Sequence, residues 1–145
     1  MTLYQRARNT LPLLLMVALL CAGCVKFIAD YDQMTADSTI KLSEKTEKFF
    51  LDLQYGTGEA QTYAANVEKY NTLEAALNAL SFRNEARPLN EDTLMQIKLT
   101  LRHLSRVRNT HRENGYNMYE FDIYRDEFRD FFKAILFGER IKPGA

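Results

Sequence analysis

The spacing of apolar residues over four successive stretches is the feature that most constrains this chain. Within each stretch they recur at intervals of three and four, as on one face of an α-helix, and the alternation of a β-strand is absent. The four stripes are Leu42, Thr46, Phe49 and Leu53; Tyr63, Val67, Tyr70, Leu73, Leu77 and Leu80; Leu94, Ile97, Leu101, Leu104 and His111; and Phe121, Tyr124, Phe128, Phe132 and Ile135. A helix with one apolar face must bury it against another element, so the sequence predicts an all-α domain.

Turn-forming residues and charges mark the boundaries of the four helices. Glycine, proline and asparagine interrupt the pattern at 56–58, 87–90 and 114–117. Asn90 and Asn117 are suited to cap the helices that follow them, and Glu120 completes a capping-box pattern with Asn117. Acidic residues gather in first turns and basic residues at later ends, as the helix dipole favours. We therefore predict helices over 30–53, 59–82, 91–112 and 118–137.

Short connections force successive helices to run antiparallel. The fold class predicted is thus an up-down four-helix bundle over residues 30–140, with 141–145 as a frayed tail. We expect Tyr63 and Tyr70 to place their rings in the core while their hydroxyls reach water or a partner.

The overall charge balance argues against a nucleic-acid partner. Lys and Arg together number 19, as do Asp and Glu, and neither half of the chain carries a large positive excess. Both cysteines, Cys21 and Cys24, lie near the start, which excludes a disulfide framework within the domain.

The first 24 residues have the three-part pattern of a secretory signal. Arg6 and Arg8 precede an uncharged apolar run at 11–20, and small residues follow before Cys24. This run of about 10 residues is short against the roughly 20 that a membrane-spanning helix needs. A permanent transmembrane anchor is the alternative interpretation.

Ala22, Gly23 and Cys24 resemble the lipobox of bacterial lipoprotein precursors. The resemblance covers residues 1–24 and implies cleavage between Gly23 and Cys24, a diacylglyceryl group on the Cys24 thiol, and acylation of the new amino terminus. Cys21 holds the place where that family prefers leucine. Residues 1–23 would then be the signal peptide and 24–29 the lipidated N-terminus with a short tether, which holds the bundle close to a membrane.

The residues after Cys24 indicate whether the lipid would be held in the outer or the inner membrane. Val25, rather than aspartate, at the second mature position implies the outer membrane by resemblance to enterobacterial sorting, while Lys26 leaves the inner membrane open. The stretch 27–32 resembles the start of small uncharacterised proteobacterial lipoproteins, a resemblance that implies no activity.

Motifs for catalysis and cofactor binding are absent from the sequence. It contains no Cys-x-x-Cys-His, His-Glu-x-x-His, Glu-x-x-His, glycine-rich phosphate loop or Gly-x-Ser-x-Gly. His103 and His111 lie about 12 Å apart along one helix and cannot share a metal. We expect no enzyme activity, metal or cofactor. The alternative is a small-ligand or haem carrier that uses the bundle interior, with one histidine and Met34 or Met118 as haem ligands.

One helix carries a basic stripe. Lys98, Arg102 and Arg106 recur at spacing four, with no acid from 98 to 112. They could bind an anionic partner such as phospholipid head groups or cell-wall polymer, or form exposed ion pairs with the acids Glu120, Asp122, Asp126, Glu127 and Asp130. The function predicted from these features is a membrane-anchored, periplasm-facing lipoprotein acting as a non-catalytic helical module that binds another envelope protein or cell-wall component.

Overall fold

The computed structural model describes residues 27–145, in which four long helices and no strands occur. Each long helix has 23 or 24 residues and is therefore about 35 Å long. They are α2 (Gln33–Tyr55), α3 (Tyr63–Glu85), α4 (Glu91–Asn114) and α5 (Met118–Arg140), and a 3-10 turn, η1 (Gly58–Gln61), lies between α2 and α3. The predicted all-α class is confirmed.

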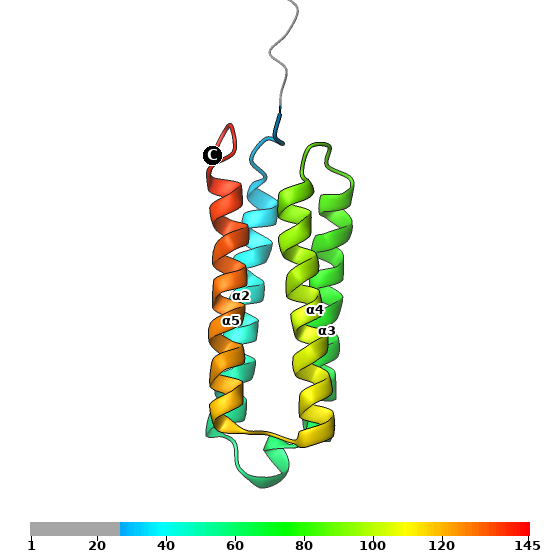
Figure 1. Cartoon of the computed structure of the whole chain (residues 1–145), viewed down its shortest axis with the longest axis vertical. Helices are drawn as coiled ribbons and strands as arrows, with labels where there is room; N and C mark the ends of the chain where they lie inside the picture. Colours follow the sequence, from blue (N-terminus) through cyan, green and yellow to red (C-terminus); the bar gives the residue numbers. More distant parts are fainter. Residues whose placement is uncertain (1–26) are drawn as a thin grey trace, which may run out of the picture.

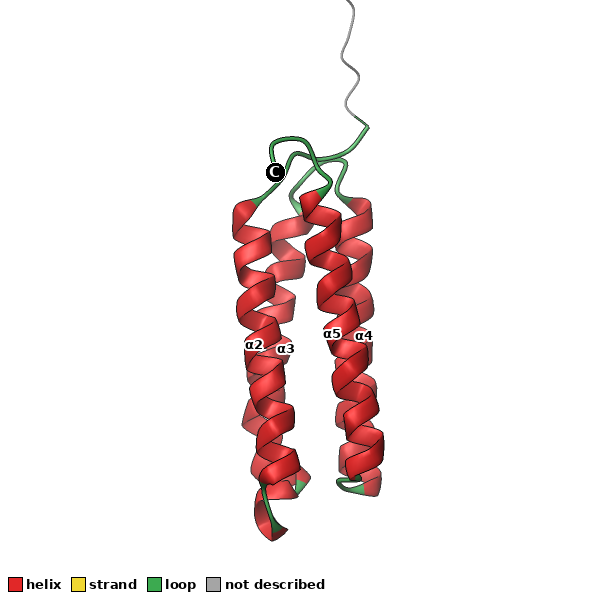
Figure 2. Ribbon diagram, turned by 90° about the vertical axis from the view of Figure 1, so that its left-hand side faces the viewer, coloured by secondary structure: helices red, strands yellow, loops and turns green. Residues whose placement is uncertain are grey.

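The four helices stand side by side and alternate in direction (Figure 1). α2 packs against α3 and α5, and α4 packs against the same two helices, so α2 and α4 face each other across the diagonal. The α3–α4 loop, the chain before α2 and the C-terminus share the end that is uppermost in Figures 1 and 2, which we call the upper end. η1 and the α4–α5 loop lie at the lower end. This is the predicted up-down bundle.

The first two helices begin later than the periodicity suggested. Asp32 caps α2, because its carboxylate accepts a hydrogen bond of 3.1 Å from the Thr35 amide. Thr62 caps α3 in the same way through the Ala65 amide, at 3.3 Å. The predicted starts at 30 and 59 were therefore three to four residues early.

The two predicted asparagine caps behave differently. Asn117 accepts hydrogen bonds from the amides of Tyr119 and Glu120 and caps α5 as expected. Asn90 precedes α4 but makes no such bond. Asn90 is thus the N-cap residue of α4, as predicted, but its side chain contacts Asn84 and Lys142 instead of capping the helix.

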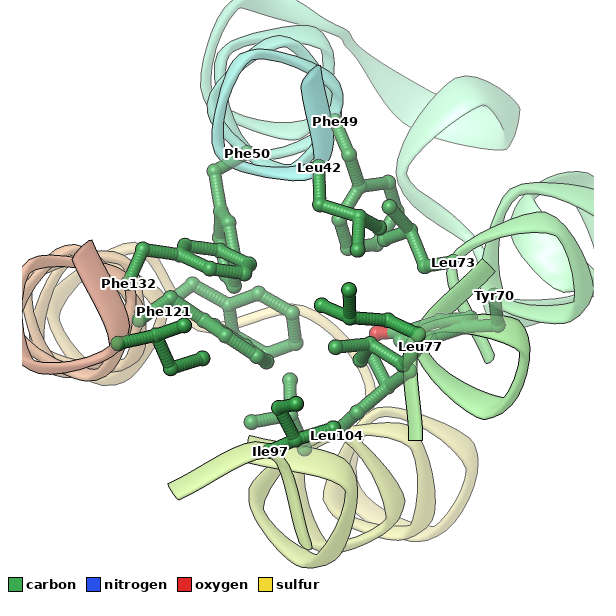
Figure 3. Close-up of a cluster of buried hydrophobic side chains, with 14 of the residues drawn as sticks. Leu42, Phe49, Phe50, Tyr70, Leu73, Leu77, Ile97, Leu104, Phe121 and Phe132 are labelled. Atoms are coloured by element: carbon green, nitrogen blue, oxygen red, sulfur yellow. The ribbon is translucent and has the colours of Figure 1, made fainter. Parts of the chain in front are cut away.

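Fifteen buried apolar side chains form one continuous core along the bundle. Phe49 and Tyr70 meet edge to face with centroids 4.8 Å apart, and Phe50 lies 6.1 and 5.6 Å from the rings of Phe121 and Phe128. Figure 3 shows these side chains pointing inward from all four helices. The interior is thus filled with side chains, as the predicted apolar stripes require.

Candidate functional site

Each helix ends its buried face at the upper end with a polar residue. Thr35 of α2, Asn84 of α3, Thr93 of α4 and Glu139 of α5 are at most 3% exposed. We call these four residues the polar layer. All four continue the spacing of three and four that their apolar neighbours set, as in Ile135 followed by Glu139. The bundle core therefore closes at this end with a layer of hydrogen-bonding groups to which all four helices contribute.

The members of the polar layer bind one another in pairs. The amide nitrogen of Asn84 donates to the Thr35 hydroxyl at 3.1 Å, which joins α3 to α2. The Thr93 hydroxyl donates to the Glu139 carboxylate at 3.0 Å, which joins α4 to α5. Two residues outside the layer, Arg87 and Asn90, donate to the Asn84 carbonyl oxygen at 3.0 and 2.7 Å and link the pairs.

A buried ion pair lies on this layer. Lys142 is only 5% exposed, and its ammonium group donates to Asn90, to Thr93 and to the carboxylate of Glu139. The three acceptors match the three N–H groups of a lysine. The prediction of a frayed tail at 141–145 is therefore wrong. These partners offset the cost of burying the Lys142 charge, and their hydrogen bonds hold the tail against the bundle.

A second carboxylate fastens the start of α2. Arg83 donates to Asp32 through two nitrogens, at 2.9 and 2.8 Å, and Thr35 adds a hydroxyl bond of 2.6 Å. The Arg83 guanidinium, followed by the Thr35 hydrogen bond, holds the pKa of Asp32 well below its usual range. Asp32 is thus a fixed negative charge that ties α2 to α3.

The chain leading into α2 is itself docked on the bundle. The Ala29 amide donates to the Leu89 carbonyl at 2.9 Å, and the Tyr31 amide donates to the Pro143 carbonyl at 2.9 Å. Arg87 donates to the Asp30 carbonyl. The predicted tether over 24–29 is therefore held in place at Ala29, which is buried.

This arrangement can fix the position of the chain but offers little for catalysis. Its charged groups are engaged with one another, and it contains no nucleophile beside a free base. Sequence reasoning missed the cluster. The available signal was Glu139 at a core position of the helical repeat, where a charge is stable only with buried partners.

A pocket of about 360 Å³ opens beside the polar layer. Its walls come from the chain before α2, the start of α4 and the end of α5. Its apolar side chains are Phe27, Ile28, Leu89, Ala134, Phe137 and Ile141, and an equal number of polar or charged side chains, among them Asn90, Thr93 and Lys142, complete the wall.

No protein-family model, no curated protein and no solved structure matches this chain. Within residues 27–145 there is no group of three or more His, Cys, Asp or Glu side chains placed to hold a metal ion. In the same range, no helix has the length and apolarity needed to cross a bilayer. The nature of the site must therefore be argued from its own residues.

The predicted basic stripe is only partly engaged in ion pairs. Lys98 lies 3.2 Å from Glu85 of α3, and Arg106 lies 2.9 Å from Glu127 of α5. Arg102 is exposed and makes no ion pair with any residue of the described part. The structure therefore does not bring all three cations into one unpaired patch.

The predicted rim of ion pairs between α4 and α5 is also smaller than expected. Among the five acids of α5 named in the prediction, only Glu127 pairs with a cation of the stripe. Asp122, Asp126 and Asp130 pair instead with basic residues of their own helix, Arg125, Arg129 and Lys133. Each lies one turn from its partner, which keeps these pairs local.

His111 is a buried neutral residue rather than a charged group at a helix end. Its Nε2 atom lies 2.9 Å from the Gln61 carbonyl, and its Nδ1 atom lies 3.0 Å from the Tyr70 hydroxyl. Because a carbonyl only accepts, Nε2 carries the hydrogen and Nδ1 accepts from Tyr70. Burial lowers the pKa of His111.

The other histidine is likewise unsuited to binding haem. Nδ1 of His103 accepts from Arg106 at 2.9 Å, and Nε2 lies 3.3 Å from the Glu127 carboxylate without hydrogen-bond geometry. Burial lowers its pKa, and Phe128 covers the ring at 4.5 Å. Since both ring nitrogens of His111 are hydrogen-bonded, Phe128 packs against the His103 ring and the interior is filled with side chains, the residues present do not fit a haem.

The residues predicted to carry the lipid lie outside this description. The signal peptide over 1–23, the cleavage site at Gly23 and Cys24, and the lipidated Cys24 all precede the described range. Phe27, the first described residue, is three positions after Cys24 and lines the pocket at the upper end together with Leu89 and Ile141.

Proposed function

We propose that this protein is a bacterial lipoprotein, anchored through lipid on Cys24, whose bundle serves as a non-catalytic module of the cell envelope. The observation that carries the proposal is the order of the first 24 residues: two arginines, an apolar run of about ten, then Ala22, Gly23 and Cys24. The hydrogen bonds that dock the chain at 29–31 on the bundle support the proposal, because they would join a lipid near the N-terminus firmly to the folded domain.

The test compares the two cysteines of the signal region. In a bacterial host, the mature wild-type chain is expected to begin at Cys24 and to carry a diacylglyceryl group and an amide-linked acyl chain by intact mass. Cys24→Ser removes the thiol to which the proposal assigns the lipid and should leave an unprocessed chain without fatty acid. Cys21→Ser is the matched control and should be processed like wild type. Fatty acid retained by Cys24→Ser would overturn the proposal.

The membrane is proposed to be the outer one, with the bundle facing the periplasm. Val25 supports this, because the aspartate associated with inner-membrane retention is missing from the second mature position. A Val25→Asp variant should move the protein to the inner-membrane fraction of an enterobacterial host. If wild type already fractionates with the inner membrane, the assignment to the outer membrane is wrong.

The proposed partner is another envelope component with anionic groups, bound over the basic stripe. Arg102 supports this, since it is the exposed member of the stripe without an ion pair among the described residues. A photo-crosslinker at position 102 should capture that component in cells. The same group at Lys41, which is exposed on the diagonally opposite helix α2, is the control. Equal crosslinking at both positions would contradict the proposal.

A further inference from the structure

The exposed apolar side chains of this bundle are concentrated around its upper end. Seven of the twelve large apolar side chains exposed in residues 27–145 belong there. We call these seven the apolar ring. It consists of Phe27, Met34, Phe82, Leu89, Met95, Phe137 and Ile141. At the lower end the exposed apolar residues come from α2 and α5 only: Tyr55, Met118, Tyr119 and Ile123.

The ring occupies one thin layer. Met34 of α2, Phe82 of α3, Met95 of α4 and Phe137 of α5 each lie one to four residues from the upper end of their helix. At 1.5 Å per residue, all four are within about 6 Å of that end. Leu89, Phe27 and Ile141 lie in the segments beyond the helix ends. Every helix therefore contributes to a band about one turn deep.

A band that encircles one end fits a planar surface lying across the bundle axis. A partner helix or strand would instead bind one continuous face, with contacts along one or two helices. Apolar side chains that rest at the boundary of head groups and acyl chains reach about 5–10 Å into a bilayer. The depth of the ring matches this range.

Two further observations support a membrane as the occupant. Phe27 is three residues after Cys24, so lipid on Cys24 would hold the ring within about 10 Å of the bilayer. The exposed charges at this end include the acids Asp30, Glu91 and Asp92 against the cations Arg83 and Arg140. This balance does not favour anionic lipids, so the contact would be apolar and insensitive to salt.

We propose that the apolar ring lies in the head-group region of the bilayer that holds the Cys24 lipid, so that the bundle stands upright on the membrane. This inference rests on the proposed lipid anchor and adds a second contact to it. Phe82 and Phe137 are 78% and 66% exposed and would supply much of the buried area. The lower end would then point away from the membrane, and the basic stripe, 7 to 15 residues along α4 from its upper end, would lie on the side of the bundle.

Tryptophan depth measurements test the proposal directly, because the chain contains no tryptophan. Phe137→Trp places one in the ring, and Tyr119→Trp places one 18 residues earlier on α5, about 27 Å away. Both native side chains are largely exposed, at 66% and 78%. Each mature lipoprotein is reconstituted in phosphatidylcholine vesicles whose acyl chains carry bromine near the head group.

The proposal is supported if bromine quenches the tryptophan fluorescence of Phe137→Trp at least about three times as strongly as that of Tyr119→Trp. The emission of Phe137→Trp should also shift to the blue, equally in 0.05 M and 0.5 M salt. Equal quenching of the two variants would overturn it. To separate this outcome from failure of the anchor, the chain from Cys24 is also coupled through its single thiol to a maleimide lipid. All core residues lie within 29–142, so this chain keeps the whole bundle. If the fluorescence of Phe137→Trp stays unquenched in the lipid-coupled chain, the proposed membrane contact of the apolar ring is refuted, whatever group the native N-terminus carries.

Discussion

The ion pair between Glu139 and Lys142 gives the sharpest prediction for stability. Both side chains are at most 3% exposed, and Glu139 also accepts hydrogen bonds from the Thr93 hydroxyl and the Asp32 amide, each 3.0 Å long. Glu139→Gln keeps the size of the side chain but leaves the Lys142 ammonium without its counter-charge in the core. Breaking a buried pair on one side costs about 3–5 kcal/mol, because the remaining charge stays buried.

We therefore expect Glu139→Gln to lower the free energy of unfolding by about 3 kcal/mol. With a urea m-value near 2 kcal/mol/M, the unfolding midpoint falls by about 1.5 M. The assay is urea unfolding of the mature chain followed by circular dichroism at 222 nm. Asp130→Asn is the matched control on α5, because Asp130 pairs with Lys133 while both side chains are more than 70% exposed. That pair contributes little.

A double variant separates the charge from the shape of the site. Glu139→Gln combined with Lys142→Met removes both charges and should recover part of the loss, since a neutral pair of similar size no longer leaves a buried ion. The reasoning is refuted if Glu139→Gln destabilises no more than Asp130→Asn, or if the double variant is less stable than Glu139→Gln alone.

Three further predictions concern pH, a helix cap and the core. Because burial holds the pKa of His111 below its usual 6.5, the unfolded chain binds a proton first and stability falls as pH drops below about 6.5, by up to about 1.4 kcal/mol per pH unit for this group. His111→Gln should reduce the fall of the urea midpoint between pH 7 and 5, while His103, whose pKa is also lowered by burial, contributes the rest; an unchanged slope would contradict this. Asp32→Ala should cost about 1–2 kcal/mol at pH 7, through loss of the α2 cap and the Arg83 pair; that cost should shrink progressively as pH falls below about 4, because the unfolded wild-type chain then binds a proton at Asp32 that the folded chain, with its lowered pKa, does not. Leu53→Ala, at a fully buried position, should lower the free energy of unfolding by about 2–5 kcal/mol. The exposed Arg102 is the contrast, because Arg102→Gln should change the thermal midpoint by no more than about 1 °C.

The fold itself could be predicted from the chain alone, because the apolar repeat is a local property. A residue such as Leu77 or Ile135 is buried whichever neighbour covers it, so period and loop length suffice to predict four antiparallel helices. Helix starts were predicted less well. Whether Asp30 or Asp32 caps α2 depends on Arg83, a residue 51 positions away.

What the sequence determined by itself is the all-helical bundle and the signal pattern that ends at Cys24. The tertiary structure alone decided how the upper end is built: that Lys142 folds back onto Glu139 and Asn90, that Ala29 docks on Leu89, and that exposed apolar residues of four helices meet in one band. The physical reason is that contacts such as Lys142 with Asn90 and Ala29 with Leu89 join residues 50 or more positions apart. A charge or an exposed phenylalanine has no preferred partner until packing brings one within reach.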